Sequence, residues 1–122
     1  MIKEKLFKTY DKFHEEKKTI ARNEMGQLKR ILSDMGLDKN INNIQVNIDY
    51  EEDIFLSDAV TVKYTIELTG IDTVDYNIIK TLDNHIIRKY GKDNLNVRDI
   101  RMKLDFVGFE YLVRLYKNDD IK

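Results

Sequence analysis

Apolar residues in the first third of the chain recur every three or four positions, as they do along one face of an amphipathic helix. These residues are Ile2, Leu6, Tyr10, Phe13, Ala21, Met25, Leu28, Leu32 and Met35. The spacing slips across residues 14–19, whose sequence HEEKKT contains no apolar residue, and Gly36 follows the last apolar position. The pattern predicts a long N-terminal helix over residues 1–36, either continuous or bent near residues 14–19.

Beyond residue 43 apolar and polar residues alternate, which is the period of a strand with one buried face. The first run has its apolar side chains at Ile44, Val46, Ile48 and Tyr50, and the second at Val60, Val62, Tyr64, Ile66 and Leu68. Residues 51–58, of which four are acidic and three are apolar, separate the two runs. We therefore predict an antiparallel β-hairpin.

A second helix and a second hairpin are predicted after Gly70. The helical stripe consists of Val74, Ile78, Leu82 and Ile86. Asp72 or Thr73 is the expected N-cap, and Gly91 lies beyond the helix end. The following strands have apolar residues at Ile100, Met102 and Leu104, and then at Phe109, Tyr111, Val113 and Leu115. Val97 is out of phase with this alternation, which predicts either a β-bulge near residues 98 and 99 or a late strand start.

The elements follow the order α-ββ-α-ββ within one domain, residues 1–122, whose ββαββ core spans residues 43–117. Because each strand has one apolar and one largely polar face, we expect an α+β fold: a two-layer sandwich in which two helices cover one face of a four-stranded antiparallel sheet. The predicted core contains Ile44, Val46, Val60, Val62, Ile66, Ile78, Leu82, Met102, Leu104, Tyr111 and Val113. The order is a circular permutation of the ferredoxin-like βαββαβ arrangement. It is also similar to the order in the LAGLIDADG homing endonucleases, but residues 28–36, LKRILSDMG, lack that family's motif, so no nuclease activity is expected.

Composition narrows the chemistry that the chain can perform. It has no cysteine, which rules out disulfides, thiolate metal sites and cysteine nucleophiles. Its two histidines, His14 and His85, are far apart and are expected to be unrelated, and no common nucleotide, zinc or serine-hydrolase motif occurs. We expect no catalytic residue, metal or cofactor, although scattered carboxylates leave an enzyme as a third alternative. With neither a secretory signal nor a membrane span, a cytoplasmic location is expected.

The loop between the first two strands is the leading candidate for a binding site. It combines carboxylates with three consecutive apolar residues, namely Glu51, Glu52 and Asp53 followed by Ile54, Phe55 and Leu56. The carboxylates could bind a divalent cation, but they lack the spacing of a calcium loop. The apolar residues either cover the edge of the core or contact a partner. We predict the second role, with Phe55 as the anchor, Leu56 as its support, and the acidic residues attracting a basic protein surface.

The polar face of the predicted sheet offers an alternative site. It carries Lys63, Arg101, Lys103, Arg114 and Tyr116, residue types that bind phosphates and stack on bases. The formal net charge of −1 and the acidic block over residues 37–72 make nucleic acid the less favoured partner. The expected function is a small, non-enzymatic protein-interaction module, an inhibitor or an adaptor that occupies a partner's surface. The alternative is binding of single-stranded nucleic acid through the polar sheet face. The long N-terminal helix further predicts a homo-oligomer that uses this helix as its interface.

Overall fold

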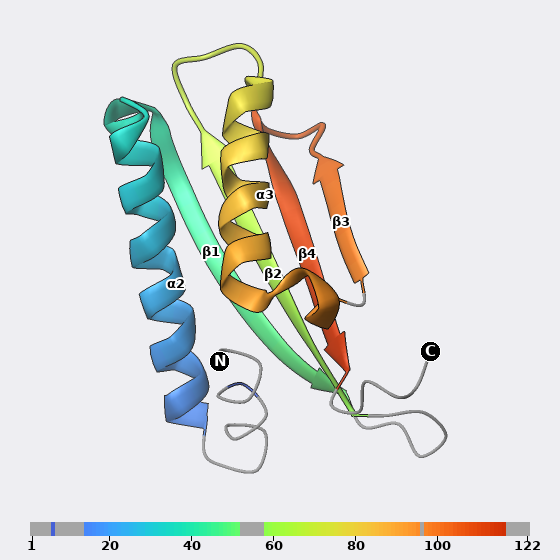
Figure 1. Cartoon of the computed structure of the whole chain (residues 1–122). Coiled ribbons are helices and arrows are strands. Elements are labelled where there is room, and N and C mark those ends of the chain that lie inside the picture. The colour runs from blue at the N-terminus through green and yellow to red at the C-terminus, as the bar shows by residue number, and fades with distance from the viewer. Residues whose placement is uncertain (1–5, 7–13, 52–57, 96, 117–122) are drawn as a thin grey trace.

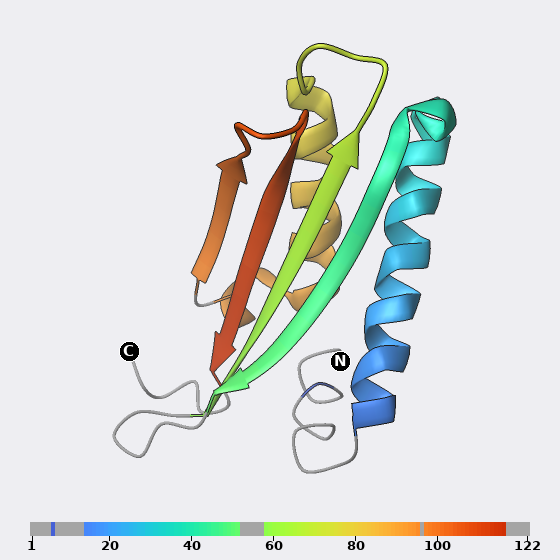
Figure 2. The same ribbon diagram turned by 180° about the vertical axis from the view of Figure 1, so that it is seen from behind.

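The computed structural model describes Leu6 and residues 14–51, 58–95 and 97–116. These residues form two layers, a four-stranded antiparallel sheet and two helices that lie on the same face of it (Figures 1 and 2). The elements follow the order α-ββ-α-ββ along the chain, so the predicted fold class is confirmed. No helix in the described part of the chain is both long and apolar enough to cross a membrane.

The helices are α2, His14–Asp34, and α3, Tyr76–Tyr90. The strands are β1, Ile41–Glu51; β2, Ala59–Leu68; β3, Val97–Met102; and β4, Gly108–Tyr116. A short 3-10 helix lies between each helix and the strand or hairpin that follows, at Asp38–Asn40 and Lys92–Asn94. The sheet order is β1-β2-β4-β3, so β2 and β4 are central while β1 and β3 are the edge strands.

Backbone hydrogen bonds show why α2 ends before Gly36. The N–H of Leu37 donates to the carbonyl of Leu32 at 3.0 Å, and the N–H of Gly36 donates to the carbonyl of Ser33 at 2.9 Å. This pair of bonds is a Schellman motif, which satisfies carbonyls that the helix end leaves free. Gly36 has a φ of 78°, a left-handed conformation that favours glycine.

Helix α3 begins later than predicted. Its N-cap is Asp75, whose side chain accepts a hydrogen bond from the N–H of Asn77 at 2.8 Å. The prediction that Asp72 or Thr73 caps the helix is therefore wrong, because the chain stays irregular for two further residues. Gly91 lies just beyond the helix end, as predicted.

The N-terminal segment is described in part. Leu6 is helical, and its side chain is completely buried in the core. Helix α2 is described from His14 onward. The residues that would show whether a single helix spans residues 1–36 lie outside the described residues, so that continuity stays a prediction.

The predicted alternation of the strands is confirmed in β1, β2 and β4. The side chains buried beneath the helices are Ile44, Val46, Ile48, Val60, Val62, Tyr64, Ile66, Leu68, Phe109, Tyr111, Val113 and Leu115. Across the central seam, β2 and β4 pair Val62 with Val113 and Tyr64 with Tyr111. Gln45 and Lys63 lie on the opposite face of the sheet, which confirms the predicted register.

The phase of β3 differs from the prediction. The strand pairs with β4 without interruption from Val97 to Met102, so Val97 marks neither a bulge nor a late start. Ile100 pairs with Tyr111 and therefore faces the helices, and side chains alternate along a regular strand. Val97, three residues before Ile100, therefore lies on the face of the sheet away from the helices. A shift in strand register does occur in the sheet, but in β1, between Ile41 and Asn43.

Two residues predicted for the core are exposed. Met102, the last residue of β3, is 53% exposed, and Leu104, just beyond it, is 104% exposed. Helix α3 lies over β2 and β4, whereas β3 lies at the margin of the helix layer (Figure 1). The prediction was wrong for both residues, because alternation gives the face of a strand but not whether a helix covers that face.

Candidate interaction surface

A buried carboxylate lies between the two helices. Glu24 on α2 is 1% exposed, and the Nζ of Lys89 on α3 lies 2.5 Å from its Oε1. Lys89 also donates a hydrogen bond to the Oε1 of Gln27 at 2.5 Å. The Nε2 of His85 lies 3.9 Å from the other Glu24 oxygen. Lys89 therefore compensates a charge that the fold removes from water.

Two tyrosines extend this polar cluster into the core. The hydroxyls of Tyr64 on β2 and Tyr90 on α3 are hydrogen bonded at 2.6 Å. Burial raises the pKa of both phenols above the ordinary value, and the negative charge of Glu24 raises both further. Both tyrosines are therefore neutral in the folded chain at ordinary pH.

The polar cluster connects the layers of the fold. The hollow above it, about 420 Å³, is lined by Gln27, Ile31, Thr81, His85, Arg88 and Lys89. Glu24 does not line this hollow, and its cation Lys89 comes from α3. Within the described ranges, no three acidic or histidine side chains are placed to hold a metal ion. What the cluster does is join α3 to α2, through the ion pair between Lys89 and Glu24.

The cluster was missed in the sequence, although a signal for it exists. Glu24 lies four residues after Ile20 and four before Leu28, both of which are buried. A charged residue at a buried helical spacing needs a partner from another element. For Glu24 that partner is Lys89 on the other helix.

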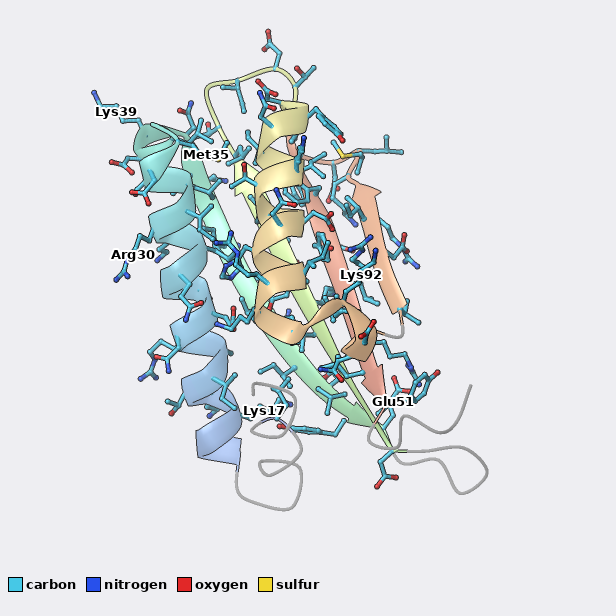
Figure 3. All side chains as sticks on the ribbon, viewed as in Figure 1. Lys17, Arg30, Met35, Lys39, Glu51 and Lys92 are labelled. Atoms are coloured by element: carbon cyan, nitrogen blue, oxygen red, sulfur yellow. The ribbon has the colours of Figure 1, made fainter. Side chains whose placement is uncertain are left out.

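The second face of the sheet carries the residues of the predicted nucleic-acid site. Figure 2 shows that no helix of the described residues lies on this face. Arg114 donates to Glu51 at 2.7 Å, and its guanidinium carbon lies 5.4 Å from the centre of the Tyr116 ring. Figure 3 places Glu51 at the end of the sheet where β1 finishes. The hydrogen bond to Glu51 raises the pKa of Arg114.

The other cations of this face are also close to carboxylates. Arg101 lies 2.8 Å from Asp99, and Lys103 lies 3.4 Å from Glu110. Lys63 is on the central strand β2, where its neighbours are Asn47 of β1 and Leu112 of β4. No carboxylate of the described residues pairs with it. The structure thus gathers the predicted residues on one face, but carboxylates offset most of their charge and weaken the attraction for phosphates.

The predicted loop site can be followed only at its first residue. Glu51 is exposed at the end of β1 and accepts the hydrogen bond of Arg114. Glu52, Asp53, Ile54, Phe55 and Leu56 lie outside the described residues. The role of Phe55 as an anchor therefore stays a prediction.

The outer edge of β3 is an open sheet edge. The strand pairs with β4 on one side, and no described element lies on its other side (Figures 1 and 2). The N–H of Lys103 donates to Gly108 of β4. Since the direction of backbone groups alternates along a strand, residues 97, 99 and 101 also bond toward β4. The N–H and C=O groups of Arg98, Ile100 and Met102 therefore point to the open side.

Exposed apolar side chains gather beside this edge. The large apolar side chains that are exposed in the described part of the chain are Tyr76, Val97, Ile100, Met102 and Leu104, here called the β3 patch. Four belong to β3 or follow it directly, and Tyr76 begins α3. The start of α3 and the end of β3 lie at the same end of the sheet in Figure 1. Apart from Val97, which lies on the other face of the sheet, the patch thus continues the edge toward the helix layer.

Side-chain contacts hold the groove between α3 and β3 in place. It is a hollow of about 280 Å³ lined by Tyr76, Ile79, Lys80, Asp83, Arg98 and Ile100. Asp83 accepts a hydrogen bond from the hydroxyl of Tyr111 and lies 3.5 Å from the Nε of Arg98. Burial and the contact with Asp83 raise the pKa of Tyr111. These contacts tie α3 to β4 and β3, so the groove is formed before any partner binds.

Comparisons of this chain with protein-family models, with curated proteins and with solved structures found no match.

Proposed function

We propose that this protein is a non-enzymatic protein-interaction module that binds its partner through the open edge of β3 and the β3 patch. The observation that carries the proposal is the coincidence of two features on one strand. Unpaired backbone groups and exposed apolar side chains both occur there, and either one alone attracts other chains.

The proposed mode of binding is strand addition. An extended segment of the partner would bond to the outward backbone groups of Arg98, Ile100 and Met102, while its side chains contact the patch. Backbone bonds give affinity without sequence preference, and the groove between α3 and β3 adds specificity through its shape. Tyr76 is 70% exposed at the mouth of this groove, a position suited to an aromatic anchor.

Several observations support this site over the others. On the polar face of the sheet, Arg101, Lys103 and Arg114 each pair with a carboxylate, and the Glu24 carboxylate of the polar cluster has Lys89 as its cation within the fold. The predicted loop contact through Phe55 is compatible with binding at β3 and would be a second contact.

The test is selection of extended peptides from a random displayed library against the intact chain. The selected peptides are then titrated with the wild type, with Met102→Lys and with the control Gln45→Lys, which places a charge on the other edge strand. Because Met102 is exposed, its substitution leaves the fold intact. We expect about a tenfold or greater loss of affinity for Met102→Lys and none for Gln45→Lys. Equal affinity for all three proteins would refute the proposal.

A further inference from the structure

We infer that the partner at this edge is a second copy of the chain, with β3 paired antiparallel to the partner's β3 about a two-fold axis at Ile100. This inference rests on the proposed function and names the partner of that same site. It follows from the charges and backbone directions of one six-residue strand.

The backbone fits this arrangement. A two-fold axis at Ile100 places Ile100 opposite the partner's Ile100, and Arg98 opposite the partner's Met102. These are the residues whose N–H and C=O groups point to the open side of β3. Every outward-pointing residue of the strand therefore meets an outward-pointing residue of the partner, and their backbone groups are satisfied together.

The side chains on the face away from the helices are complementary in the same register. Asp99 lies opposite the partner's Arg101, and Arg101 lies opposite the partner's Asp99. In the single chain these two side chains pair with each other at 2.8 Å while 44% and 66% exposed, respectively. In the pair of strands, opposite charges face each other across the new ladder, where side chains approach most closely.

Neighbouring registers lack this complementarity. An axis at Asp99 would place Asp99 opposite the partner's Asp99, and an axis at Arg101 would place two arginines together. Like charges directly opposite each other destabilise strand pairing. The strand therefore specifies a single register for pairing with itself.

The other sheet edge is not self-complementary. The charged residues of β1 are Asp49 and Glu51, both acidic, so two copies of β1 offer no opposite charges to each other. β1 also carries a register irregularity between Ile41 and Asn43, a device that discourages edge pairing. Self-association by strand pairing is thus directed to β3.

Pairing also covers the apolar side chains next to the edge. Ile100 and Met102 lie on the helix side of β3, which α3 leaves open. Joining two sheets at this edge places the two α3 helices on the same side of one eight-stranded sheet, with the groove of each copy beside the seam. The exposed side chain of Ile100 then packs against the partner's Ile100.

Charge reversal tests this register by sedimentation equilibrium of the full chain. The wild type should dimerise, whereas Asp99→Arg and Arg101→Asp should each raise the dimer dissociation constant by about a hundredfold or more, since two opposite-charge contacts become two like-charge contacts. Mixing the two variants should restore a dimer, because each strand then meets the opposite charge. The control Asp49→Arg, on β1, should leave the dissociation constant unchanged. Circular dichroism checks that every variant is folded.

Each outcome bears on the inference. A wild type that stays monomeric at high micromolar concentration overturns it, and so does a dimer that persists in both reversed variants. If the wild type is monomeric but selected peptides still lose affinity for Met102→Lys, the edge binds another protein, and only the second-copy inference fails. If a dimer forms that charge reversal does not affect, another surface, such as the N-terminal helix, forms the interface and the second-copy inference fails. The proposed function fails as well only if the selected peptides also bind the wild type and Met102→Lys with equal affinity.

Discussion

The ion pair between Glu24 and Lys89 should respond asymmetrically to removal of its two members. The Glu24 side chain is 2% exposed, whereas the Lys89 side chain is 18% exposed and lines the hollow between the helices. Lys89→Met leaves a carboxylate in the interior without its cation. Glu24→Met leaves an ammonium that can turn toward water through the hollow. The first change should therefore cost much more stability than the second.

The magnitudes follow from this geometry. An uncompensated buried charge costs about 3–5 kcal/mol, so Lys89→Met should remove a large part of the 5–15 kcal/mol typical of a folded domain. Glu24→Met loses the pair but leaves no charge trapped, and we expect a cost of about 1 kcal/mol. The double variant should be close to the wild type, because replacing both members by apolar side chains of similar size removes the desolvation penalty together with the attraction.

Urea unfolding of the wild type and these three variants at neutral pH, followed by circular dichroism, measures the coupling as a double-mutant cycle. Lys80→Met, an exposed lysine on the same helix, is the matched control and should change the free energy of unfolding little. The reasoning would be refuted if Lys89→Met cost no more than Lys80→Met, or if the double variant lost the sum of the two single losses.

Burial raises the pKa values of Tyr64, Tyr90 and Tyr111, so the folded chain keeps protons that the unfolded chain releases above pH about 10. These tyrosines should therefore leave the free energy of unfolding unchanged below that pH and lower it above that pH by about 1.4 kcal/mol per pH unit for each tyrosine. Urea unfolding between about pH 9 and pH 11 measures this slope, which should be smaller in Tyr111→Phe than in the wild type. Equal slopes in the two proteins would contradict the prediction. In Gly108→Ala the added Cβ would lie 2.0 Å from a carbonyl oxygen of β2, so the backbone must shift. Thermal unfolding should show a loss of several kcal/mol, which is the upper end of what overpacking costs. Gly26→Ala, in open space on α2, should instead stabilise the fold by about 0.5–1 kcal/mol, and the opposite ranking would count against this packing.

The sequence predicts the faces of the strands well because alternation reports one physical fact, which side of a strand is apolar. Val62, Tyr64 and Val113 are buried as predicted. Met102 and Leu104 are exposed because their cover depends on how far α3 extends across the sheet, and that distance is a property of packing between layers. No local pattern encodes it.

The candidate sites were harder to predict. The interaction surface at β3 depends on which strand lies at an edge, and the order β1-β2-β4-β3 is not visible in the sequence. Glu24 was missed because its partner Lys89 lies on the other helix, so their contact appears only when both helices pack on the sheet. Phe55, the predicted anchor, lies outside the described residues and keeps its status as a prediction.

The strand order also has a consequence for how the chain folds. β1 with β2 and β3 with β4 are successive along the chain, whereas β2 and β4 pair although α3 and β3 lie between them. The molecule therefore consists of two consecutive helix-and-hairpin halves joined along the β2–β4 seam. Hairpins close quickly because their strands are near each other in sequence, while contacts between distant segments require a larger loss of chain entropy. Docking of the two halves, with Tyr64 set opposite Tyr111, is the step that should limit the rate of folding.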